Sequence, residues 1–232
     1  MARTSTLSAL RTSAYRRADQ ENLTERFPTS EVTDYVNEGI AELWDYLVAA
    51  GGYSYFGKTT TLNLVGGTVS YSLPADFYKN HKVVYDGPGT EKTELLRLSE
   101  EDEAALASVT GQPSFYRVRA SSIDIYPAPA ASGNCTLHYV PAATKLVSDA
   151  DTFDGINGWE EYVVCYAARR MAIKDADFEL ANMIYQDMNR QIQRIERMSS
   201  ERDRGQPKRV KDIRGALPGR LGLRRRIVPP RF

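Results

Sequence analysis

The chain has 232 residues, of which 42% are hydrophobic and 26% charged, and its 30 basic and 30 acidic residues leave no net charge. These values are typical of a globular protein and exclude a fully disordered chain. No apolar run approaches the roughly 20 residues of a membrane-spanning helix, and the first 18 residues lack the apolar centre of a secretory signal. Two cysteines cannot form a disulfide framework. We therefore expect a soluble, intracellularly made protein with a sizeable core.

The first 50 residues predict two helices. Apolar residues recur at helical spacing over about 5–18, and a longer amphipathic stretch follows over about 30–49. In the second stretch one face carries Val32, Val36, Ile40, Leu43 and Leu47. Glycines at 51 and 52 end it.

The middle of the chain, about 58–145, predicts a small antiparallel β insertion. β-branched residues favour strands at 59–65 and 68–73, and Gly66-Gly67 between them is typical of a two-residue hairpin. A further strand is expected at 82–85. A short acidic helix is then expected at 99–109, with Ser99 as its N-cap.

Three later stretches of the same region predict a meander, in which each strand pairs with the next one along the chain. They are 115–119, 123–126 and 134–140. Pro127 and Pro129 mark the turn between the last two.

The last third predicts two more helices, at about 159–174 and 177–198, joined by a turn short enough to make them antiparallel. The predicted apolar stripe of the second consists of Phe178, Ala181, Ile184, Met188, Ile192, Ile195 and Met198. Helices at both ends with strands between them indicate an α+β fold. We expect a mostly helical four-helix bundle interrupted by the small antiparallel β insertion, forming a body over residues 1–198.

Residues 199–232 differ from the body in charge and in composition. They contain eleven basic and three acidic residues, a net charge of +8, so residues 1–198 carry −8. Interspersed Gly and Pro exclude a long helix. We interpret this segment as an extended basic arm that orders on a protein partner, although a disordered tail or a nucleic-acid arm would share its charge. The predicted partner-binding residues are Val210, Ile213, Leu217, Leu221, Leu223, Arg224, Arg225, Arg226, Ile227 and Phe232.

Residues 52–59 match the phosphate-loop pattern G-x-x-x-x-G-K-S/T, with Lys58 as its lysine. Such a loop must lie between a strand and a helix, so that a helix N-terminus faces the phosphate. Here a helix precedes the motif and a strand follows it. We favour a helix stop followed by aromatic packing. The competing hypothesis, a nucleotide hydrolase, predicts that Lys58→Ala abolishes activity.

Other patterns that could carry chemistry are weak. Asp149, Asp151 and Asp154, with Glu160 after them, suggest calcium ligands, but Phe153 occupies a ligand position and a turn before a helix explains the same residues. The two cysteines, Cys135 and Cys165, and the two histidines, His81 and His138, form no motif typical of a catalytic nucleophile. We predict no catalytic residue, no metal, no cofactor and no enzyme activity.

Four stretches resemble a known family when taken in order: LPADFYK at 73–79, IDIYPAP at 123–129, HYVPA at 138–142 and FDGINGWEEY at 153–162. Together they are similar to the head-to-tail adaptor (connector) proteins of tailed bacteriophages, including the tail-tubular and tail-accessory adaptors of short-tailed phages. The resemblance covers most of residues 30–200.

The resemblance implies a structural virion protein, made in the host cytoplasm and located at the neck between capsid and tail. It implies a ring, typically of twelve copies, below the portal protein, with a downstream tail or neck protein as a further partner and no membrane. Double-stranded DNA would pass through the ring during packaging and ejection, and the C-terminal arm would dock on the portal. A nucleic-acid-binding protein with a basic C-terminal arm is the alternative. An acidic body facing the channel would repel passing DNA.

Overall fold

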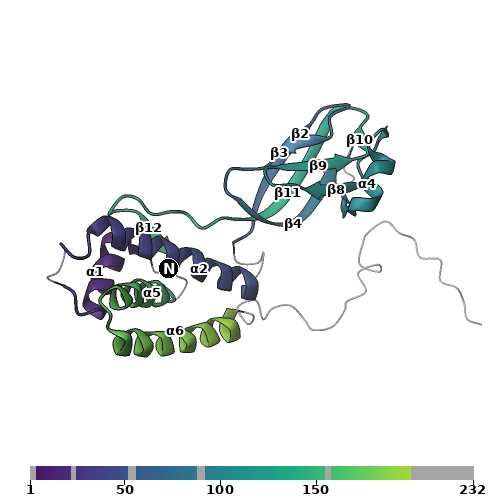
Figure 1. Cartoon of the computed structure of the whole chain (residues 1–232). Helices are drawn as coiled ribbons and strands as arrows, with labels where there is room; N and C mark the ends of the chain where they lie inside the picture. The colour runs from purple at the N-terminus through teal and green to yellow at the C-terminus, as the bar shows by residue number, and fades with distance from the viewer. Residues whose placement is uncertain (1–3, 22–24, 52–55, 88–91, 155–157, 200–232) are drawn as a thin grey trace, which may run out of the picture. The chain divides into compact units, whose positions relative to one another are not determined.

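The computed structural model describes residues 4–21, 25–51, 56–87, 92–154 and 158–199 (Figure 1). All of them belong to one compact unit, Met1–Arg202. Helices from both ends of this unit pack on one another, and strands from its middle form sheets.

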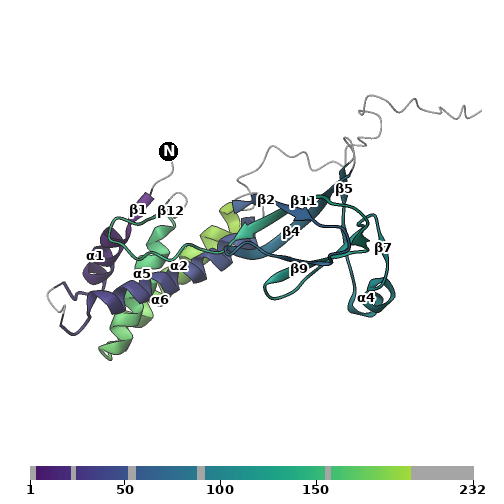
Figure 2. The same cartoon turned by 90° about the horizontal axis from the view of Figure 1, so that it is seen from above.

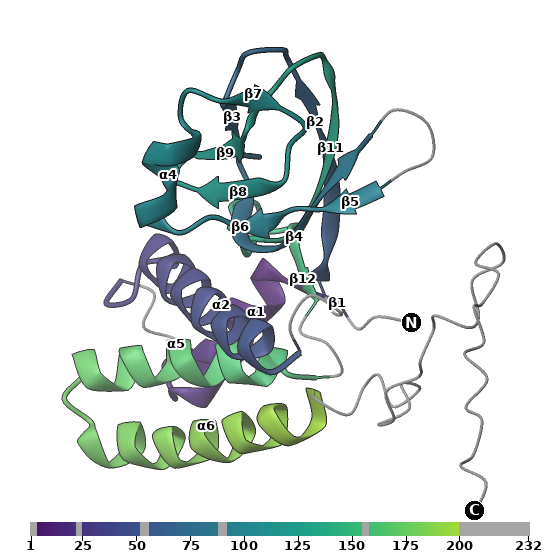
Figure 3. The same ribbon diagram turned by 90° about the vertical axis from the view of Figure 1, so that its right-hand side faces the viewer.

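The four helices predicted from apolar spacing at the two ends of the body all form. Side-chain capping bonds mark the starts of the first and the last of them. The backbone N–H of Ala9 donates to Thr6 Oγ1 at 3.2 Å at the start of the first helix. At the start of the last helix, the N–H of Leu180 donates to Asp177 Oδ1 at 3.0 Å. Between the last two helices the chain reverses at Ala176, whose φ of 61° is left-handed, and these two helices run antiparallel in Figure 3. The helices are α1 (Leu7–Arg17), α2 (Thr29–Gly51), α5 (Glu160–Lys174) and α6 (Phe178–Ser199).

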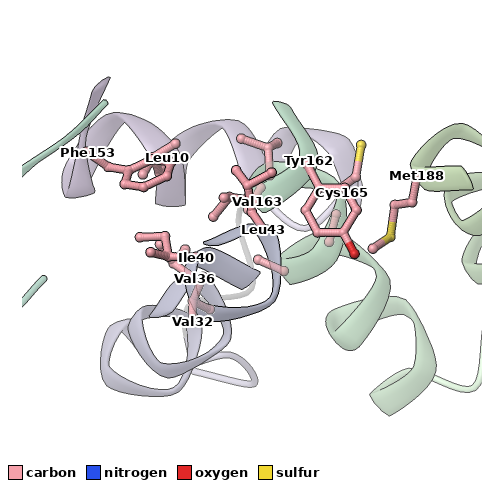
Figure 4. Close-up of a cluster of buried hydrophobic side chains, with 14 of the residues drawn as sticks. Leu10, Val32, Val36, Ile40, Leu43, Phe153, Tyr162, Val163, Cys165 and Met188 are labelled. Atoms are coloured by element: carbon pink, nitrogen blue, oxygen red, sulfur yellow. The ribbon is translucent and has the colours of Figure 1, made fainter. Parts of the chain in front are cut away.

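The helical core takes side chains from every one of these helices (Figure 4). The face of α2 predicted from spacing is buried throughout, from Val32 to Leu47. Tyr162 and Val163 of α5 are fully buried beside it, and Met188 of α6 is 3% exposed. Removing this apolar surface from water is the main stabilising contribution to the helical part.

A two-stranded sheet that the sequence pattern does not predict extends the helical core. Strand β1 (Thr4–Thr6) pairs antiparallel with β12 (Thr152–Asp154), so a segment far along the chain lies beside the start of α1. Its central residue, Phe153, is 7% exposed and packs in the helical core.

The strands between α2 and β12 form two four-stranded sheets, seen in Figures 1 and 2. The first has the order β2 (Lys58–Leu64), β11 (Gly133–Pro141), β4 (Phe77–Asp86) and β5 (Lys92–Glu94). The second has the order β3 (Ser70–Ser72), β9 (Ser122–Tyr126), β8 (Phe115–Val118) and β6 (Leu96–Arg97). Short strands β7 (Thr110–Gly111) and β10 (Ala128–Pro129) pair with each other.

The two sheets enclose a second core. It includes Val83, Ile123, Ile125 and Leu137, all fully buried. The predicted acidic helix is α4 (Glu100–Leu106), and the Asp102 N–H donates to its N-cap Ser99 at 3.3 Å. No residue of α4 is buried.

The prediction of a hairpin around Gly66-Gly67 is wrong. A turn does form there, because the Thr68 N–H donates to the Val65 carbonyl at 3.0 Å and Gly67 has a φ of 77°. The strands on either side then enter different sheets, β2 beside β11 and β3 beside β9. All seven residues of β2 find partners on the long strand β11, whereas β3 has only three residues.

The predicted meander is correct only in its first half. Strands β8 and β9 pair antiparallel, but β11 pairs with β2 and β4 and not with β9. Pro127 and Pro129 cannot donate backbone hydrogen bonds. The chain leaves the second sheet at this point and forms β10, which runs parallel to β7.

The predicted fold class, a mostly helical four-helix bundle with a small antiparallel insertion, is therefore wrong. Residues 58–141 hold two four-stranded sheets with a core of their own. Two strand pairs, β6–β8 and β7–β10, are parallel. Several strands have only two to five residues, which is too short to show a clear alternation of apolar and polar residues. The sequence pattern therefore underestimates the strand content relative to the helices.

Candidate assembly surfaces

Lys58, the lysine of the phosphate-loop pattern, begins strand β2 and its ammonium contacts Asp76 Oδ2 at 2.9 Å. The hydroxyl of Tyr139 donates to the other oxygen of Asp76 at 2.8 Å. These bonds, that of Lys58 first, hold the pKa of the Asp76 carboxyl below its ordinary value. A strand and not a helix follows Lys58, so the helix N-terminus that a phosphate loop needs is missing at this place. Residues 52–55 of the pattern lie outside the described residues.

The same ion pair lines a cavity of about 340 Å³ at the end of α2. Trp44 and Phe56 form part of its wall, with ring centroids 4.0 Å apart. The Trp44 indole N–H donates to the Pro141 carbonyl at 3.0 Å. The aromatic contact agrees with our interpretation of the pattern as a helix stop followed by aromatic packing.

The suggested calcium ligands have structural partners. Asp151 Oδ2 accepts from the backbone N–H groups of Val147 at 2.7 Å and Ser148 at 2.8 Å, which lowers the pKa of its carboxyl. Asp149 is bound by the guanidinium of Arg11. In the ranges that the structure describes, no group of three acidic, cysteine or histidine side chains could hold a metal ion. Asp151 closes a turn, as the simpler interpretation expects.

Each core contains one cysteine, and both thiols are buried. Burial raises the pKa of Cys135, in the sheet core, to about 12 and that of Cys165, in the helical core, to about 11. His138 lies in the same strand as Cys135, and burial lowers the pKa of its imidazole. Because the thiolate is the reactive form, both thiols are poor nucleophiles at neutral pH.

Carboxylates of α2 meet tyrosines of α5 along the contact between these helices. The buried Tyr162 hydroxyl donates to Glu42 Oε1 at 2.7 Å, and burial together with this bond raises the pKa of Tyr162. The Tyr166 hydroxyl donates to Glu38 Oε2 at 3.3 Å. Gly39 allows this close packing, because a Cβ there would lie 3.0 Å from the Cβ of Tyr166.

Basic residues of α5 also bind α2. Arg170 contacts Glu38 at 3.0 Å, and the Lys174 ammonium contacts Glu31 Oε2 at 2.6 Å. The bond from Lys174 is the main cause that lowers the pKa of Glu31. These acidic residues of the body therefore bind α2 to α5 in addition to contributing to the negative charge of the surface.

An ion network holds α4 on the second sheet. Glu103 of α4 is bound by the guanidinium groups of Arg117 and Arg119 and accepts from the Tyr126 hydroxyl at 2.8 Å. Arg119 also binds Asp124, which is 5% exposed. The bond from Tyr126, with the two arginines, lowers the pKa of Glu103. No residue of α4 is fully buried, and the network centred on Glu103, whose side chain is 19% exposed, attaches the helix to the sheet.

Helix α6 also exposes large apolar side chains outside its buried stripe. Phe178 is 69% exposed, Met183 54% and Tyr185 45%. The guanidinium of Arg169 lies 4.7 Å from the ring centroid of Tyr185. Phe178 was expected in the buried stripe of this helix, where Ile184 and Met188 do lie. The spacing of Phe178 places it near that stripe. Phe178 is, however, the first residue of α6, and the described neighbouring elements do not cover it.

The partner-binding residues predicted from the sequence all belong to the arm and lie outside the described residues. They are Val210, Ile213, Leu217, Leu221, Leu223, Arg224, Arg225, Arg226, Ile227 and Phe232. Only Ser199 of the predicted arm is described, as the last residue of α6.

The sequence matches the SU10 adaptor protein family over residues 5–211, which is 207 of its 232 residues. The chain therefore belongs to the SU10 adaptor family. This match confirms the resemblance to phage head-to-tail adaptors and makes the chain a structural adaptor protein of a phage.

The family match ends within the predicted arm. Residues 199–211 are matched, whereas residues 212–232, with all the predicted contacts except Val210, lie beyond the match. A comparison with curated proteins found no match. In the part of the chain that the structure describes, each helix is too short or too polar to cross a membrane.

Proposed function

We propose that the chain forms a ring of identical copies, typically twelve, at the neck of the virion between the portal and the tail. Membership of the adaptor family, which spans the helical part, the sheets and the start of the arm, carries this proposal. Such a ring joins the capsid to a downstream tail protein and surrounds the channel through which double-stranded DNA passes.

The arm, residues 199–232, docks on the portal. Its net charge of +8 and its spaced apolar residues suit a groove on a protein surface. Each fully buried large side chain contributes about 1.5–3 kcal/mol before the cost of ordering an extended segment, which is large. Many arms bound from one ring offset that cost, because each bound arm raises the local concentration of the next.

The acidic body keeps passing DNA from adhering to the ring. Residues 1–198 carry a net charge of −8, and α4 begins with four acidic residues, of which Glu100 has a side chain 85% exposed. Carboxylates that face the channel would repel phosphates and leave the DNA mobile.

The test compares three chains for binding to the purified portal ring: the full chain and truncations that end at residue 198 and at residue 211. We expect the full chain to co-elute with the portal in size-exclusion chromatography and the shortest chain to elute alone, folded by circular dichroism. The chain ending at residue 211 keeps the part of the arm that matches the family, so it shows whether residues 212–232 are needed for binding. Normal attachment without residues 199–232 would contradict docking by the arm. No complex, together with salt-sensitive binding to duplex DNA, would favour the nucleic-acid alternative.

A further inference from the structure

We propose that neighbouring copies in the ring meet through the exposed face of α6 on one copy and an acidic side, formed by residues 147–154, on the next. This inference rests on the proposed ring and names the surfaces that would build it. Its occupant is a second copy of the chain.

The exposed face of α6 carries an apolar residue followed by arginines. Met183, Arg190, Arg194 and Arg197 are separated by seven, four and three residues, which places them on one stripe of the helix. Met183 is 54% exposed, and all three arginines are exposed. Arg190 contacts Asp187 at 3.1 Å on the same helix, an exposed pair that contributes little and that a stronger partner could replace.

The acidic side has the complementary composition. Val147 is 76% exposed, the most exposed large apolar residue in the described ranges. The side chain of Asp149 is 71% exposed, and Asp154 is also exposed. Bonds from Arg11 to Asp149 and from two backbone N–H groups to Asp151 hold the loop in place. Val147 among carboxylates is thus complementary, in apolar contact and in charge, to Met183 among arginines.

The two surfaces lie on opposite sides of the helical part. Helix α5 contacts both α1 and α6, and β12 pairs with β1 at the start of α1. Figures 1 and 3 show α6 on one side of α5 and the strand pair on the other. A contact between two different surfaces is head-to-tail, and it closes into a ring when the rotation between copies permits. Contact of α6 with α6 would instead set arginines against arginines.

Charge reversal gives a direct test. Each variant is mixed with the portal, and ring formation is measured by mass photometry. One variant carries Arg190→Glu and Arg194→Glu, and the other carries Asp149→Arg and Asp154→Arg. Each variant alone would set like charges against each other, and we expect at least a tenfold loss of rings. A mixture of the two should restore rings, because alternating copies make every contact complementary again. A control with Lys79→Glu and Arg97→Glu, which changes the net charge as the first variant does but on the sheets, should assemble normally.

The outcomes separate this inference from the proposed function. If the wild-type chain forms no ring with the portal, the proposed function fails. If the wild type forms rings and both variants do so equally well, the ring stands and the interface is wrong. Loss of rings by each variant without rescue in the mixture would also overturn it.

A cysteine pair keeps the interface testable if a charge variant does not fold. Val147→Cys with Met183→Cys should yield a ladder of disulfide-linked oligomers on oxidation in the presence of the portal, since the two native thiols are buried. Val65→Cys with Met183→Cys is the matched control, because Val65 is 55% exposed but lies on the sheets. Equal ladders from both pairs, or none from the first, would contradict the proposal.

Discussion

The helical part and the sheets are stabilised in different ways. The helices share one large core, and the carboxylates of α2 are matched by tyrosines and cations of α5. The sheets have a smaller core, and α4 is attached to them by ion pairs of Glu103 without any fully buried apolar side chain. The comparison indicates that buried apolar surface and bonds between helices stabilise the helical part, whereas Met183 of α6 lies outside its core and is 54% exposed.

The largest expected effect is in the helical core. Tyr162→Ala removes a fully buried ring and its bond to Glu42, and we expect a loss of about 3–5 kcal/mol in the free energy of unfolding, measured by urea denaturation. Tyr162→Phe keeps the ring and should cost only about 1 kcal/mol. Equal losses in the two variants would show that the hydroxyl, and not the buried ring, dominates at this position.

The sheet core should respond through its own cysteine. Leu137→Ala, at a fully buried position of β11, is expected to cost about 2–5 kcal/mol. Local opening of the sheets should then speed the reaction of Cys135 with a thiol reagent more than that of Cys165, which can be followed in C165S and C135S backgrounds. Equal acceleration of both thiols would mean that the two cores open together.

A substitution between α2 and α5 tests how tightly the frame is packed. Gly39→Ala places a methyl group 3.0 Å from the Cβ of Tyr166, and we expect a loss of about 1–3 kcal/mol by thermal or urea unfolding. Ala41→Gly, at an exposed position of the same helix, is the control and should cost about 1 kcal/mol through helix propensity alone. A neutral or stabilising Gly39→Ala would contradict the close packing.

The smallest effect is expected at α4. Because the folded protein lowers the pKa of Glu103, the ionised carboxylate stabilises the docked helix above the ordinary glutamate pKa, and this contribution is lost as pH falls through the lowered value. Hydrogen exchange of α4 amides, corrected for its intrinsic pH dependence, should lose protection on acidification before the helical core does. Glu103→Gln should reproduce this loss at neutral pH, whereas Glu101→Gln in the same turn should not. Unchanged protection in Glu103→Gln would show that other contacts hold α4.

The sequence predicts local structure better than the partners of each element. The period of Val32, Val36 and Ile40 identifies the buried face of α2, and the short turn before α6 correctly makes the last two helices antiparallel. Strand pairing depends on residues far apart in the chain, so neither the separation of β2 from β3 nor the pairing of β1 with β12 could be read from local pattern.

The candidate surfaces were less predictable. Helical spacing placed Phe178 with the buried residues, because spacing gives the face of a helix but not the length over which a neighbour covers it. The stripe from Met183 to Arg197 could have been found from its spacing of seven, four and three. Nothing local, however, sets Val147 and its acidic neighbours on the opposite side of the helices. The arm residues, from Val210 to Phe232, remain a prediction from sequence.

The central claim, a ring of adaptor copies on the portal, is tested most directly by weighing the assembly. Purified portal rings are mixed with the full chain and measured by mass photometry beside the chain that ends at residue 198. Twelve copies of 26.0 kDa should add about 312 kDa to each portal ring, as one discrete species that the truncated chain does not form. Portal rings that keep their original mass at saturating concentrations of the full chain would contradict the account.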